Sequence, residues 1–118
     1  MTEMKTLRSI AYARSGDKGN SANVGIIAFN PEGFSFLKNY LTVARVKEYF
    51  APLNPSDVLR YELPNLYAFN FILEEALGGG GSQSLRIDSQ GKALGQALLE
   101  MPIEISLEEW EKCSRRKK

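Results

Sequence analysis

Hydrophobic and polar positions alternate over several short segments of the chain, a pattern that predicts strands. Residues Lys5–Arg14 are rich in strand-forming side chains and end at a cluster of turn formers over residues 15–21. Residues Asn23–Phe29 predict a second strand. Both faces of this strand are apolar, so we expect it to be central in a sheet that is covered on two sides.

The middle of the chain predicts a broken helix followed by a strand. The helix begins at Pro31 and ends at Tyr40, and it continues after Thr42, whose hydroxyl suits an N-cap, until two prolines end it. Residues Val58–Leu63 alternate strictly between two faces of a strand. One face of that strand is apolar, with Leu59, Tyr61 and Leu63.

A second helix is predicted over Leu66–Leu77. Its apolar residues recur at helical spacing, Asn65 can cap its start and Gly78 suits the position just past its end. Asn70 falls within the apolar stripe of this helix. A buried amide needs hydrogen-bond partners, so we expect Asn70 either to bind the glycine-rich backbone that follows or to face a ligand.

The last third of the chain predicts a strand and two helices. Residues Ser84–Asp88 alternate as a short strand, Lys92–Met101 has helical spacing, and Ser106 with Glu109 forms a capping box for a helix through Trp110. The predicted order is β-β-α-β-α-β-α-α. Such an order indicates an α+β sandwich in which helices cover one face of a mainly antiparallel sheet of about four strands, and a ferredoxin-like fold is the obvious candidate.

Composition limits the chemistry that such a domain can perform. The chain has 118 residues, no histidine and one cysteine. Histidine-based triads, Cys-His dyads, internal disulfides and imidazole or thiolate metal sites are therefore excluded within one chain. We expect no metal and no cofactor, and any catalysis has to use carboxylates, Lys, Tyr, Ser, Thr or backbone dipoles.

Charge separates a body of residues 1–111 from a tail of residues 112–118. The tail carries five basic residues, whereas the body has ten basic and fourteen acidic residues, a balance of −4. A basic tail can attract nucleic acid or anionic lipid, but a frayed solubilising end is the simpler interpretation, and we prefer it. Without an apolar leader or membrane span, we expect a cytoplasmic protein with neither a nucleic-acid nor a membrane partner.

The densest polar cluster lies between the first two predicted strands. Its candidate site residues are Arg14, Ser15, Gly16, Asp17, Lys18, Gly19, Asn20 and Asn23. Two interpretations remain open: glycines and cations can form a backbone cradle for an anion, or the segment is a hairpin turn that needs Gly, Asp and Asn for conformation alone. In the first interpretation, Asp17 could serve as a base while Arg14 or Lys18 holds the anion.

Two further regions carry candidate residues. Four consecutive glycines, including Gly78 and Gly79, form either a flexible connector or a place where a ligand or another backbone passes close. The polar faces of two predicted strands carry the charges Arg60, Glu62, Arg86 and Asp88. If these strands are neighbours, the charges share the sheet surface opposite the helices. They could pair with one another or form a docking surface.

Several of these segments resemble one family. The run Ala13–Asn20, then Asn23-Val24-Gly25, Arg60–Leu66, Asn70-Phe71, Ala76–Gly80 and Ser84-Leu85-Arg86 are similar to the ferredoxin-fold domain at the C-terminus of acyclic terpene utilisation protein A (AtuA). The resemblance covers about Tyr12 to Pro102. It implies a ferredoxin-like fold, a setting in acyclic terpenoid or branched acyl-CoA catabolism, and Arg14, Asp17, Lys18, Asn20, Asn70 and Arg86 as site or interface residues.

Two functions fit these features. The first is an accessory domain or subunit, not catalytic alone, that completes a site on a larger AtuA-like chain. The second is a small homo-oligomeric enzyme or binding protein for an anionic ligand, such as an acyl-CoA or a phosphate-bearing molecule, at residues 14–23.

Overall fold

The computed structural model describes residues 2–18, 21–74 and 92–115 of the chain. The predicted strand Ser84–Asp88 and the candidate residues Gly19, Asn20, Gly78, Gly79 and Arg86 lie outside these ranges. Asp17 and Lys18 are described through their backbone.

The main sheet consists of four antiparallel strands. They are β2 (Ala11–Lys18), β3 (Ser21–Ala28), β4 (Asp57–Leu63) and β5 (Ala68–Glu74), in the spatial order β2-β3-β5-β4. The prediction that the second strand is central is confirmed, since β3 pairs with β2 on one side and with β5 on the other. One of its two apolar faces is nevertheless uncovered in the described chain.

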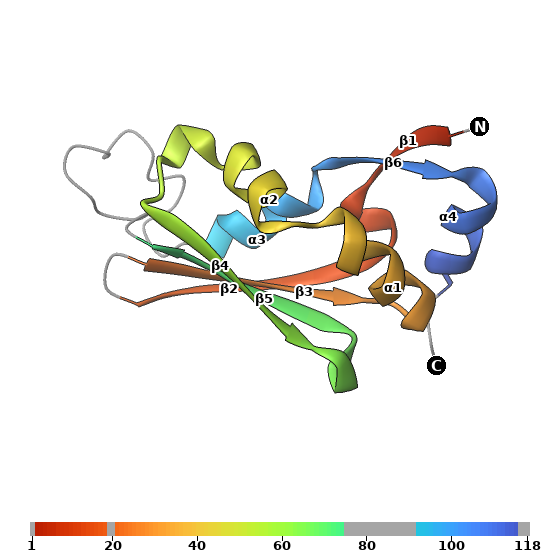
Figure 1. Ribbon diagram of the computed structural model, residues 1–118, viewed down its shortest axis with the longest axis horizontal. Helices are drawn as coiled ribbons and strands as arrows, with labels where there is room; N and C mark the ends of the chain where they lie inside the picture. The colour runs from red at the N-terminus through yellow and green to blue at the C-terminus, as the bar shows by residue number, and fades with distance from the viewer. Residues whose placement is uncertain (1, 19–20, 75–91, 116–118) are drawn as a thin grey trace.

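Three helices, α1 (Pro31–Tyr40), α2 (Val43–Tyr49) and α3 (Lys92–Leu99), cover one face of this sheet (Figure 1). The predicted break in the helix between Tyr40 and Thr42 is confirmed. The Thr42 hydroxyl accepts a hydrogen bond from the Arg45 amide at 3.1 Å and caps the start of α2. Asn30 caps α1 in the same way through the Gly33 amide at 2.8 Å. A short 3-10 turn, Ala51–Leu53, leads from α2 to β4.

The two ends of the chain form a separate two-stranded ribbon. Strand β1 (Thr2–Thr6) pairs antiparallel with β6 (Pro102–Ser106), and helix α4 (Leu107–Cys113) follows. The predicted single strand Lys5–Arg14 is therefore wrong, since a 3-10 turn at Leu7–Ser9 separates β1 from β2. The turn moves the chain from the ribbon to the main sheet, and the Leu7 amide donates to the Met101 carbonyl there. Ser106 caps the start of α4 by accepting a hydrogen bond from the Glu109 amide, as the capping box predicts.

The predicted helix Leu66–Leu77 is wrong over its described part, which forms β5. A 3-10 turn, Pro64–Leu66, ends with Tyr67 in the left-handed region at φ 53°, and the strand begins at the next residue. Phe69, Phe71 and Leu73 are buried while Asn70 and Ile72 are half-buried. This is the two-residue period of a strand. Packing between β3 and β4 overrides the helical spacing that the same residues also satisfy.

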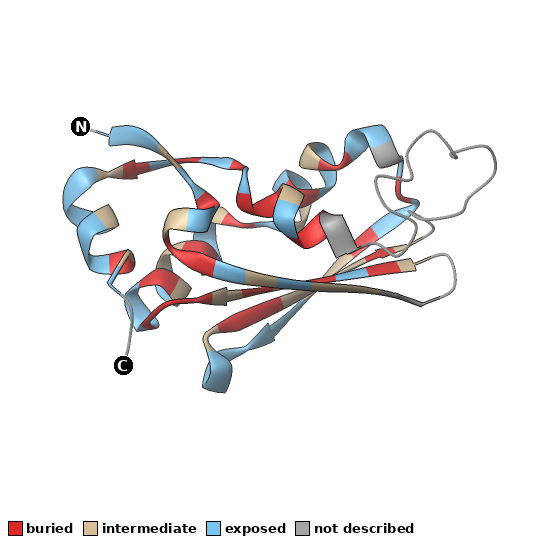
Figure 2. Cartoon of the chain, turned by 180° about the vertical axis from the view of Figure 1, so that it is seen from behind, coloured by how far each residue is buried: buried red, intermediate tan, exposed pale blue. Residues whose placement is uncertain are grey.

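The core lies between the sheet and its helices. Its largest fully buried side chains include Phe69, Phe71, Ile26 and Leu37, and Figure 2 shows the buried residues where these layers face each other. From β3 to α3, the described elements follow the β-α-β-β-α order of a ferredoxin-like fold. The expected α+β sandwich is confirmed. Strand β2 forms one edge of the main sheet beside β3, and β6 belongs to the two-stranded ribbon. No helix of the described residues is long and apolar enough to cross a membrane.

Candidate functional site

The sheet face opposite the helices carries no helix within the described residues, and we call it the open face. Alternation and pairing register place on it three residues of β2 whose side chains are described and four residues of each other strand. They are Tyr12, Arg14 and Gly16 of β2, Ser21, Asn23, Gly25 and Ile27 of β3, Ala68, Asn70, Ile72 and Glu74 of β5, and Asp57, Leu59, Tyr61 and Leu63 of β4.

Three rows of these residues cross all four strands, and Ser21, Asp57 and Glu74 continue the face beyond them as a polar end. An apolar row contains Tyr12, Ile27, Ala68 and Leu63, and a central row contains Arg14, Gly25, Asn70 and Tyr61. A third row contains Gly16, Asn23, Ile72 and Leu59. Leu59, Tyr61 and Leu63 of β4 are all large, whereas the two glycines of the face lie on β2 and β3.

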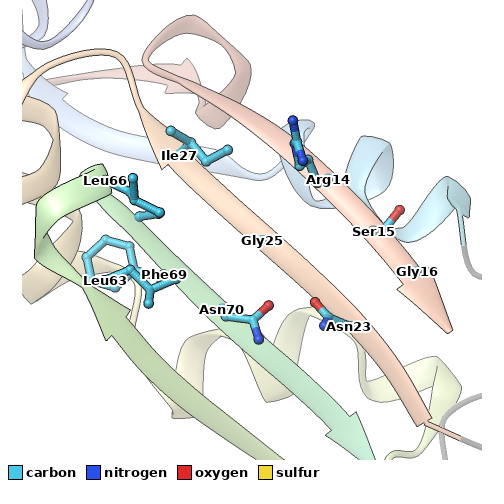
Figure 3. A pocket seen from close by; sticks show the side chains of 11 residues that line it. Arg14, Ser15, Gly16, Asn23, Gly25, Ile27, Leu63, Leu66, Phe69 and Asn70 are labelled. Atoms are coloured by element: carbon cyan, nitrogen blue, oxygen red, sulfur yellow. The ribbon is translucent and has the colours of Figure 1, made fainter. Parts of the chain in front are cut away.

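A hollow of about 580 Å³ occupies part of the open face (Figure 3). Gly25 lies at its floor, while Arg14, Asn23 and Asn70 provide polar groups and Leu63 with Ile27 provides apolar ones. Leu66 extends the apolar wall beyond the sheet. Figure 3 shows the side chains of Asn23 and Asn70 beside one another on adjacent strands. Several segments that the family resemblance rests on are thus brought together here.

Neither glycine of the open face is explained by the packing around it. A Cβ atom at Gly16 would meet no described atom within 4 Å, and one at Gly25 would make contacts of 3.9 Å and longer. Neither residue has the positive φ that favours glycine. Glycine inside a strand weakens it and often marks the close approach of a ligand or another chain. Gly95 of α3 differs, because its Cβ would lie 3.2 Å from the Ser15 hydroxyl oxygen.

Arg14 provides the positive charge of the central row. Its side chain is exposed, and within the described residues it forms no hydrogen bond or ion pair. Ser15 points to the opposite side of β2, against Gly95 of α3. The structure therefore places Arg14, Gly16, Asn23 and Asn70 around one hollow and separates Ser15 from them.

The segment between the first two strands is shorter than the predicted turn over residues 15–21. Strand β2 continues to Lys18, which pairs with Ser21, and Asp17 pairs with Ala22. The connection between the strands is reduced to residues 19 and 20. A cradle made by the backbone of residues 15–18 is excluded by this pairing, because their conformation is extended.

Arg60 and Glu62 of β4 face the helices, contrary to the expectation for the open side. The Arg60 guanidinium donates to the Lys38 and Leu41 carbonyls at 3.1 and 2.9 Å, and it pairs with Glu62 at 2.8 Å. Arg60 thus satisfies the carbonyls at the end of α1. Leu59, Tyr61 and Leu63, the predicted core side of the strand, are consequently on the open face.

The described groups with raised pKa values, Cys113 and Tyr49, lie outside the open face. No group of three or more metal-ligating side chains occurs in the described residues. Burial, together with smaller contributions from Glu109 and Glu32, raises the pKa of Cys113 to about 11. Burial and the nearby Glu100 raise the pKa of Tyr49. Both groups lie outside the open face and favour their neutral forms.

Sequence reasoning missed the apolar contribution to this face from Tyr12, Ile27, Leu63 and Leu66. The available signal was the second apolar side of β3, which contains Ile27. Among these side chains, Tyr12 is 48% exposed and Leu66 is 63% exposed. Large exposed apolar groups that cluster on one face indicate an interaction surface.

Fold and face together define a ferredoxin-like α+β domain in which the described helices cover one side of the sheet only. The model of the AtuA ferredoxin-like domain matches residues 5–104. The chain therefore belongs to the AtuA ferredoxin-like domain family. No curated protein and no solved structure matches it.

Proposed function

We propose that this chain is an accessory domain or subunit, not catalytic by itself, that binds another chain through its open face. The assembly would include a larger AtuA-like chain and act in the catabolism of acyclic terpenoids or related branched acyl-CoA compounds. The observation that carries the proposal is the apolar and glycine-containing sheet face, which no described element covers. A soluble sheet normally has polar side chains on an exposed face.

Affinity capture tests this function directly. The tagged chain, expressed in its native host, should recover a larger AtuA-like chain that mass spectrometry identifies by sequence. Capture under conditions that preserve known complexes of the same host provides the positive control. Recovery of this chain without any AtuA-like chain would contradict the proposal.

Arg14 supports a second candidate function, the binding of a small anionic ligand such as an acyl-CoA or a phosphate-bearing molecule. Its guanidinium borders the hollow and has no partner among the described residues. Titration calorimetry against acyl-CoA esters should then detect binding that Arg14→Ala weakens by about 1–3 kcal/mol, the contribution of a charge-assisted hydrogen bond. Lys47→Ala, which removes an exposed charge from α2, should leave it unchanged. Absence of heat at millimolar ligand would exclude this candidate.

A further inference from the structure

The open face has a size and composition that suit one particular partner. Four strands about 4.8 Å apart and seven residues of about 3.3 Å each give a footprint of about 19 by 23 Å. Two such faces, treated as flat, would together bury about 900 Å². Side chains that project from the sheet increase this area. Specific interfaces begin near 1,000–1,200 Å², so a complex of two faces would be weak and reversible.

We propose that a second copy of this chain packs on the open face, about a two-fold axis that runs along the strands between β3 and β5. The inference rests on the proposed function only in that the open face docks another chain. Sheets that pack face to face keep their strands nearly aligned, about 10 Å apart. A two-fold axis along the strands meets this requirement and superimposes the two faces completely.

The register of the sheet makes the face complementary to itself about this axis. Each residue of β2 then lies opposite the β4 residue of the same row, and each residue of β3 lies opposite one of β5. Gly16 therefore faces Leu59 of the second copy, so the smallest residue of that row meets a large apolar one. Arg14 faces Tyr61 of the second copy, where a guanidinium and an aromatic ring attract each other.

The same arrangement accounts for the two glycines that the single chain does not require. Gly25 faces Asn70 of the second copy, and Gly16 leaves room for a leucine. A two-fold axis across the strands is less favourable. To overlap the two faces completely, it has to pass between the central row and the third row, where it places Leu63 against Asp57 and Ala68 against Glu74 of the second copy.

Sedimentation and light scattering of the purified chain test the dimer from micromolar to millimolar concentrations. We expect a reversible monomer–dimer equilibrium that Leu63→Asp weakens at least about tenfold, because it buries a charge in the interface. Leu107→Asp is the matched control, since Leu107 of α4 is exposed by 43% and Leu63 by 41%. Arg14→Glu provides a second interface variant that leaves the core intact. Unfolding curves show that each variant is folded.

Cross-linking tests the axis itself. In a variant with Gly16→Cys and Leu59→Cys, a bismaleimide of about 8 Å should join two copies, whereas within one chain these positions are three strands, about 14 Å, apart. The native Cys113 is buried and does not compete. A monomer at every concentration, equal effects of Leu63→Asp and Leu107→Asp, or no cross-linked dimer would overturn the proposal. A monomer that still captures an AtuA-like chain, and loses it through Leu63→Asp, would overturn the dimer and support the proposed function.

Discussion

Asn30 connects two distant parts of the chain, and its replacement should destabilise the fold by more than an ordinary cap residue would. Its side-chain oxygen accepts from the Gly33 amide at 2.8 Å, and its amide nitrogen donates to the Lys112 and Arg115 carbonyls at 2.8 and 2.6 Å. The residue is 6% exposed. It therefore starts α1 and holds the end of α4 at the same time.

The expected magnitude follows from these three hydrogen bonds. Loss of an N-cap costs about 1 kcal/mol, and each further buried hydrogen bond contributes about 0.5–1.5 kcal/mol. Asn30→Ala should thus lower the free energy of unfolding by about 2–4 kcal/mol. Asn30→Ser retains an oxygen for the cap but no donor for the two carbonyls, so it should recover about 1 kcal/mol of that loss.

Urea unfolding followed by circular dichroism measures these differences. Thr42→Ala is the matched control, because the Thr42 side chain caps α2 through one hydrogen bond at 3.1 Å. We expect this control to lose about 1 kcal/mol. Equal losses for Asn30→Ala and Thr42→Ala would refute the reasoning, since the bonds to the end of α4 would then contribute nothing.

Three further predictions concern single side chains. The fold raises the pKa of Cys113 from 9.0 to about 11, so the stability that its neutral thiol contributes should be complete below pH 9 and be lost as the pH rises through 11. In urea unfolding, the difference in unfolding free energy between wild type and Cys113→Ala should therefore shrink over this range. Tyr49→Phe removes a hydrogen bond of 2.6 Å to the Ala97 carbonyl and should lower the unfolding free energy by about 1 kcal/mol, a result that an unchanged denaturation midpoint would contradict. Gly16→Ala should stabilise the monomer by about 0.5–1 kcal/mol in thermal unfolding, whereas Gly95→Ala should destabilise it, because the added Cβ would crowd the Ser15 hydroxyl at 3.2 Å.

The sequence predicted the elements that local chemistry determines. Helix α1 begins at Pro31 and ends at Tyr40 as expected, and Thr42 and Ser106 start the following helices as their side chains predict. Caps and prolines act within a few residues, so these boundaries can be recognised without the rest of the fold.

The error at β5 arose because two periods fit the same residues. Phe69 and Leu73 are four positions apart, which suits a helix, but Phe71 between them is also buried and only a strand explains that. The side of β4 that faces the core was equally undetermined. Alternation separates its two faces but does not identify the inner one, and Arg60 faces inward because the end of α1 supplies carbonyls that bind it.

Part of the candidate site could be predicted as a set of residues but not as an arrangement. Arg14 and Asn23 were selected from one polar cluster and Asn70 from a distant segment, and pairing of β2, β3 and β5 brings them to one face. The sequence placed Arg14 in or beside a turn and Asn70 on a helix. Long-range strand pairing decides both positions, and this information is not contained in a local segment.

The ribbon at the chain ends has a consequence for the order of folding. Thr2 pairs with Ser106, whereas the β2–β3 and β4–β5 pairs each join strands that are close in the sequence. Contacts between distant residues carry a larger entropic cost of loop closure and slow folding. On a ribosome, β1 emerges before β6 and has no partner until β6 has been made. Although β1 is made earlier than every other described strand, it should therefore be among the last to reach its native hydrogen bonds.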